Sequence, residues 1–119
     1  MRTLSGVVAI AALLLAAVVA RAESLMQFTV VNIEYEGSKI WTPATLVVEK
    51  GDKVKLTLIN NVKSEPSQHG FAIAAYNIAE LVARGEPKTV EFTADKAGIF
   101  PINCQLHPTH VGGQLVVLR

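Results

Sequence analysis

The chain has 119 residues, enough for one domain, and half of them are apolar. Its formal net charge is +1 and no basic cluster stands out, which argues against a nucleic acid or an anionic membrane surface as partner. A single cysteine, Cys104, excludes a disulfide within the chain.

The N-terminal segment has the features of a secretory signal peptide. Arg2 precedes an apolar run from Gly6 to Ala20, and Ala20-Arg21-Ala22 is a small-residue cleavage pattern. The run is shorter than the ~20 residues of a membrane-spanning helix. We therefore expect residues 1–22 to be removed on export and residues 23–119 to form one domain, periplasmic or secreted and without a membrane partner. A retained membrane anchor is the alternative.

The remaining chain alternates short β-type segments with turns. The first predicted strand spans residues 28–35, with a bulge at Val30-Val31 where the alternation slips. Further along we expect one or two helical turns at residues 78–84, and strands at residues 45–49, 53–58, 71–74, 88–93, 99–104 and 114–118. About seven short strands bounded by turns predict an all-β fold, a β-sandwich.

The most informative motif lies between residues 104 and 110. Cys104 is followed by His107 and His110 at intervals of three residues, and Pro108 disfavours a helix at His107. The segment is therefore predicted to be a loop that can turn these side chains toward one point. A sandwich can bring the third histidine, His69, to the same end of the fold.

A thiolate with imidazoles suits copper or zinc. The sequence has no paired zinc-finger ligands, no second cysteine for a two-copper centre and no C-x-x-C-H motif for haem. These observations predict a site for one metal ion, with copper favoured.

The mature sequence resembles the cupredoxin family along nearly its whole length. The resemblance is carried by residues 43–54, 69–71 and 92–98, and by Cys104 and His107 leading to residues 113–117. It implies a Greek-key β-sandwich with one copper ion at one end, held by His69, Cys104 and His107. Within the family the sequence is most similar to nitrosocyanin-like red copper proteins, in residues 92–98 and 104–108. This likeness implies that His110 is a further ligand, where blue copper proteins have methionine.

The sequence departs from the nitrosocyanin-like pattern near the site. The spacing from His107 to His110 is shorter, and His69 stands where those proteins have a glutamate, with Glu65 four residues earlier. Met26, the only methionine after the signal segment, is far from the loop, so His110, Gln114 or water is the fourth ligand. A strongly bound His110 predicts a tetragonal rather than a blue copper site.

Three functions are compatible with such a site. Electron transfer, with a redox protein as partner, is the first expectation and requires a closed copper site. A redox enzyme or sensor for nitric oxide or an oxygen species requires an open copper position, and a copper carrier is the third option. Whether the chain is an enzyme stays open, as does its oligomeric state, with a trimer among the options.

Aromatic and aliphatic side chains near the motif have structural roles in this interpretation. We expect Phe71, Phe100, Leu106 and Val111 to form an apolar collar around the metal. Trp41 is expected to serve packing rather than electron transfer.

Overall fold

A computed structural model describes residues 24–119, so the predicted signal peptide lies outside the described residues. This part of the chain forms nine strands and one 3-10 turn: β1 (Leu25–Tyr35), β2 (Ser38–Thr42), β3 (Thr45–Glu49), β4 (Lys53–Asn60), β5 (Gln68–Ile73), η1 (Ala74–Tyr76), β6 (Ile78–Ala83), β7 (Lys88–Thr93), β8 (Gly98–Ile102) and β9 (Gly113–Leu118). From residue 24 onward, no helix has the length and hydropathy needed to cross a membrane.

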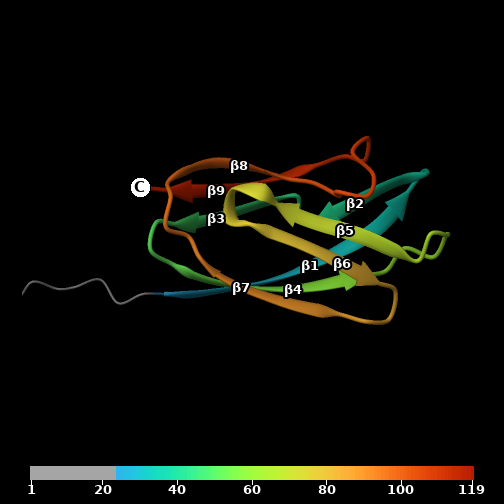
Figure 1. Cartoon of the computed structure of the whole chain (residues 1–119), viewed down its shortest axis with the longest axis horizontal. Coiled ribbons are helices and arrows are strands. Elements are labelled where there is room, and N and C mark those ends of the chain that lie inside the picture. The colour runs from blue at the N-terminus through green and yellow to red at the C-terminus, as the bar shows by residue number, and fades with distance from the viewer. Residues whose placement is uncertain (1–23) are drawn as a thin grey trace, which may run out of the picture.

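The strands form two main sheets and a hairpin. One sheet has the order β2-β1-β4-β7, the other has the order β3-β9-β8, and β5 pairs with β6. Figure 1 shows β3, β8 and β9 in one layer and β1, β4 and β7 in the other, with the β5–β6 hairpin beside them. The predicted all-β sandwich is confirmed.

The core lies between the two layers and follows from the alternation along each strand. Val54, Leu56 and Leu58 of β4 point inward, and Leu46 of β3 and Leu115 of β9 are buried with them in one cluster. Burying each such side chain stabilises the fold by roughly 1.5–3 kcal/mol. The two sheets are therefore held together mainly by these inward-facing aliphatic residues.

The helical turns predicted for residues 78–84 are wrong, because this segment is strand β6. It pairs antiparallel with β5, from Gln68 opposite Ala83 to Ile73 opposite Ile78. Its buried residues, Ile78 and Val82, are four positions apart, a spacing that fits one face of a helix and one face of a strand equally well. The backbone groups of β5 decide between the two, because they need a partner along this edge.

The bulge predicted at Val30-Val31 is also wrong. The pairing of β1 with β4 runs without a break from Leu25 opposite Lys53 to Asn32 opposite Asn60. The inward position after Val30 is Asn32, which is buried although it is polar. A polar residue on the core face, rather than an extra residue in the strand, interrupts the hydrophobic alternation.

The hairpin formed by β1 and β2 contains a strand that is absent from the predicted elements, β2 at Ser38–Thr42. Glu36 and Gly37 at the turn have positive φ angles of 47° and 81°, the conformation of a tight hairpin turn. The returning strand places Trp41 opposite Asn32. This pairing brings the indole into the end of the sandwich that holds the candidate site.

Candidate metal centre

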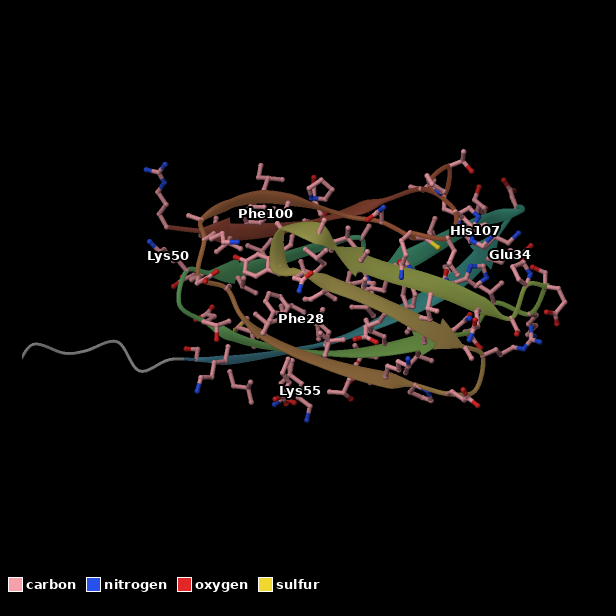
Figure 2. All side chains as sticks on the ribbon, in the orientation of Figure 1. Phe28, Glu34, Lys50, Lys55, Phe100 and His107 are labelled. Carbon is pink, nitrogen blue, oxygen red and sulfur yellow. The ribbon has the colours of Figure 1, made fainter. Side chains whose placement is uncertain are left out.

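The four residues singled out from the sequence meet at one end of the sandwich. His69 comes from β5, and Cys104, His107 and His110 come from the loop between β8 and β9. One ligand atom from each residue lies within 4.8 Å of every other. Bonds of about 2.0–2.3 Å keep two ligand atoms of one ion at most about 4.6 Å apart, so the group has nearly the size of a single-ion site. Figure 2 shows His107 at this end and Phe100 toward the opposite end.

Two successive tight turns explain why intervals of three residues bring the loop side chains together. The His107 N–H donates to the Cys104 carbonyl at 3.1 Å, and the His110 N–H donates to the His107 carbonyl at 3.0 Å. Each turn advances the chain by three residues and returns the next side chain to the same side. The imidazole rings of His107 and His110 are consequently stacked, with centroids 4.5 Å apart and planes 18° apart.

His69 approaches the group from a buried strand. Its side chain is 0% exposed, and neither ring nitrogen has a hydrogen-bond partner among the described residues. Leaving a buried polar group without a partner costs about 1–3 kcal/mol. A metal ion that accepts the lone pair of one nitrogen removes part of this cost, so the unpartnered imidazole fits a metal ligand.

Cys104 is nearly buried and belongs to the same group. It is 5% exposed, its Sγ lies 3.6 Å from His107 Nδ1, and the Gly70 N–H donates to Sγ at 3.1 Å. A hydrogen bond from a backbone N–H stabilises negative charge on sulfur. The cysteine is therefore placed to bind as a thiolate beside the imidazoles.

The electrostatics of the site favour neutral imidazoles. The pKa of His69 is lowered, first by burial and then by the nearby His107 and His110. Burial, followed by His107 and Lys39, also lowers the pKa of His110. Because only the neutral ring has a lone pair for a metal, both shifts keep these two side chains available as ligands near neutral pH.

Two residues that hold the His69 side of the site were not recognised from the sequence. The first is Asn60, whose side chain donates to the carbonyls of Ser67 at 2.9 Å and Val82 at 3.0 Å and accepts from the Val62 N–H at 3.0 Å. The alternation of β4 could have indicated this role, because it places residue 60 on the buried face with Leu58.

The second is Arg84, which holds the segment before His69. Its guanidinium donates to the carbonyls of Val62 at 3.1 Å and Lys63 at 2.7 Å, and it pairs with Glu65 at 3.1 Å. Glu65, four residues before His69, is 76% exposed and lies outside the metal-binding group. Gln114, another candidate for the fourth position, is exposed and donates to Thr45 Oγ1 at 3.2 Å.

The predicted apolar collar is only partly present. Phe71 is buried and packs edge-on against Trp41, with ring centroids 5.3 Å apart, which agrees with the packing role predicted for Trp41. Phe100 contacts Tyr76 in the other half of the core, so its assignment to the collar is wrong. Leu106 and Val111 are 45% and 62% exposed, and they form part of the surface near the site rather than a buried shell.

Comparison with known families identifies the class of protein. Residues 7–117 match the model of the cupredoxin-like domain, so the chain belongs to this family. Its group of three histidines and one cysteine is a ligand set that suits copper. The likeness to the nitrosocyanin-like subtype stays a prediction.

Relatives of known sequence or structure include copper enzymes. A segment of 57 residues is 46% identical to nitrous-oxide reductases of Cupriavidus necator and Ralstonia nicotianae, and it covers 48% of this chain but only 9% of each reductase. The fold matches a copper nitrite reductase from Nitrosomonas europaea with a TM-score of 0.61 and 27% identity, over 80% of this chain and 42% of the reductase. It matches a copper-containing nitrite reductase from Thermus scotoductus with a TM-score of 0.64 and 28% identity, over 80% of this chain and 28% of the reductase. A copper binding protein in its apo form has the same fold, with a TM-score of 0.62 and 20% identity over 80% of this chain and 89% of that protein.

Proposed function

We propose that this chain is an exported electron-transfer protein that holds one copper ion with His69, Cys104, His107 and His110. The observation that carries the proposal is the convergence of these four side chains, with ligand atoms within 4.8 Å of one another. Copper would supply a one-electron couple between Cu(II) and Cu(I). A site with four protein ligands leaves little room for a substrate, which favours electron transfer over chemistry at the metal.

The protein residues would limit the rearrangement that accompanies electron transfer. His69 is fixed on a paired strand, and Cys104 is fixed by its hydrogen bond from Gly70. His107 and His110 are held by consecutive turns. A ligand set that moves little between the two oxidation states keeps the barrier to electron exchange low, because less reorganisation is needed.

The surface beside the loop supports a protein partner. His107 is only partly buried, and the exposed Leu106 and Val111 flank the ligands of the loop. An apolar surface can be desolvated at low cost when another protein docks. We propose that a redox protein approaches the copper through this face.

A second candidate is redox chemistry on a small nitrogen oxide or oxygen species. It is favoured by the likeness to proteins named as nitrite and nitrous-oxide reductases, although the chain spans less than half the length of each of them. This function requires that copper keeps an open position, which means that His110 does not bind. Azide added to the copper protein separates the two, because a changed visible spectrum indicates an accessible metal.

The copper proposal is tested by an anaerobic titration of the purified protein with Cu(II). We expect one equivalent to produce an intense visible sulfur-to-copper band and a copper EPR signal. Cys104→Ser should remove the band while the far-UV circular dichroism stays that of a β protein. Val111→Ser, which changes an exposed side chain of the same loop, is the control and should retain the band. A band that survives in Cys104→Ser would show that sulfur is not a ligand.

Export is tested separately by the intact mass of the protein recovered outside the cytoplasm. We expect a chain that begins at Glu23, after the Ala20-Arg21-Ala22 pattern. A recovered chain that still contains residues 6–20 would contradict cleavage and support an anchor.

A further inference from the structure

The backbone beside Cys104 contains an interrupted strand pairing. Ala72 of β5 pairs antiparallel with Asn103, through hydrogen bonds of 2.8 and 3.0 Å in the two directions. Two residues back along β5, the same register would place Gly70 opposite Gln105. The backbone groups of Gly70 have other partners, however, and these partners are side chains of the site.

Two side chains take the place of the backbone hydrogen bonds that Gly70 would otherwise make to Gln105. The Gly70 N–H donates to Cys104 Sγ at 3.1 Å, and the Gly70 carbonyl accepts from the indole N–H of Trp41 at 2.9 Å. Both hydrogen bonds are buried. Since the two groups flank one Cα atom, a donor that fixes the carbonyl also restricts the direction of the N–H.

The Gln105 side chain packs against Gly70, at the position that a side chain on residue 70 would occupy. Its side-chain amide donates to the Glu80 carbonyl of β6 at 3.1 Å. A Cβ atom added to Gly70 would overlap the Gln105 side chain at Oε1 and Cδ. Gly70 does not have a positive φ, so packing beneath Gln105, rather than backbone strain, accounts for glycine at this position.

We propose that Trp41 and Gln105 are positioning residues that direct the Gly70 N–H at the Cys104 sulfur and thereby set the reduction potential of the copper site. The part that concerns copper rests on the proposed function. A donor to the sulfur reduces its donation of electron density to copper, which disfavours Cu(II). Weakening this hydrogen bond therefore lowers the reduction potential and moves the sulfur-to-copper band to longer wavelength.

The positioning is tested first in the metal-free protein by amide hydrogen exchange at Gly70. Trp41→Phe removes the indole donor and keeps an aromatic ring against Phe71. We expect faster exchange at Gly70 in this variant, with little change at Ile73, further along the same strand. Tyr76→Phe, which removes a side-chain hydrogen bond to the Lys96 carbonyl in the other half of the core, is the matched control and should leave Gly70 unchanged. Unchanged exchange in Trp41→Phe would overturn the proposal, whether or not the protein binds copper.

The role of Gln105 is tested by a double-mutant cycle on thermal unfolding. Gly70→Ala should lower the melting temperature because the new Cβ meets Gln105, and Gly70→Ala with Gln105→Ala should recover much of the loss. Equal losses with and without Gln105 would overturn this contact.

In the copper-loaded protein, Trp41→Phe should lower the reduction potential and Tyr76→Phe should not. If the reduction potential and the sulfur-to-copper band are the same in wild type and Trp41→Phe, the effect on the metal is overturned. If the wild type shows no sulfur-to-copper band, the proposed function is refuted, and the exchange result alone decides whether Trp41 positions Gly70.

Discussion

The two sides of the candidate site are built in different ways. His69 lies on β5, is fully buried and is surrounded by strands and by the hydrogen bonds of Asn60. His107 and His110 lie in a loop, are partly exposed and are ordered by two backbone turns. The strand side is therefore expected to depend on the core of the domain, whereas the loop side can change with little effect on folding.

The largest expected effect is on stability, at a core residue next to His69. Phe71→Ala removes a fully buried ring that packs against Trp41 and should lower the free energy of unfolding by about 3–5 kcal/mol. Val111→Ala, on the exposed loop, should change it by no more than about 0.5 kcal/mol. Urea unfolding of the metal-free variants measures both. Comparable losses would mean that the loop is as integral to the core as the strand.

A second prediction concerns the copper affinity that His69 supplies. His69→Ala should weaken copper binding by more than about 100-fold, because even residues behind the ligands of a metal site are worth 10–100-fold. His110→Ala should weaken it less, since its loop can rearrange around the remaining three ligands. Competition with a copper chelator gives the two dissociation constants. The reverse order would show that His69 is a neighbour of the metal rather than a principal ligand.

The third prediction is that the stability of the metal-free protein depends on pH through His69, on the strand side of the site. The folded-state pKa of His69 is lowered, so near and below its ordinary value of about 6.5 the unfolded chain binds more protons than the folded one. Stability should therefore fall as the pH decreases from about 7.5 to about 5.5, and fall no further from this group once the pH is below the folded-state pKa. Urea midpoints should show a smaller decrease in His69→Gln, and an identical decrease would assign the effect to other groups.

The smallest expected effect is spectroscopic and concerns His110. Replacing it with methionine exchanges a strong nitrogen donor for a weak thioether, so His69, Cys104 and His107 would hold the copper with only a weak fourth donor. We expect the absorption of the copper protein to shift toward that of a blue site, with narrower copper hyperfine splitting in EPR. A wild type that is already intensely blue, and that is unaffected by His110→Met, would show that His110 is not a ligand and that the likeness to nitrosocyanin-like proteins does not extend to this residue.

The sequence by itself determined the fold class and the members of the cluster. Strands β3 and β7 have the predicted bounds, because regular alternation is a local property of the chain. Cys104, His107 and His110 could be recognised from the sequence because each of the two turns that bring them together advances the chain by only three residues. His69 was found because so few histidines occur in the chain.

Only the tertiary structure decided the surroundings of the metal-binding group. The buried roles of Asn60 and Asn32, the strand at Ile78–Ala83 and the position of Phe100 away from the site all depend on which strands become neighbours. The same is true of the hydrogen bond from Trp41 to Gly70, which joins residues 29 positions apart. Such contacts satisfy backbone groups that strand pairing leaves over, and the pairing itself is fixed by packing across the whole sandwich rather than by any local pattern.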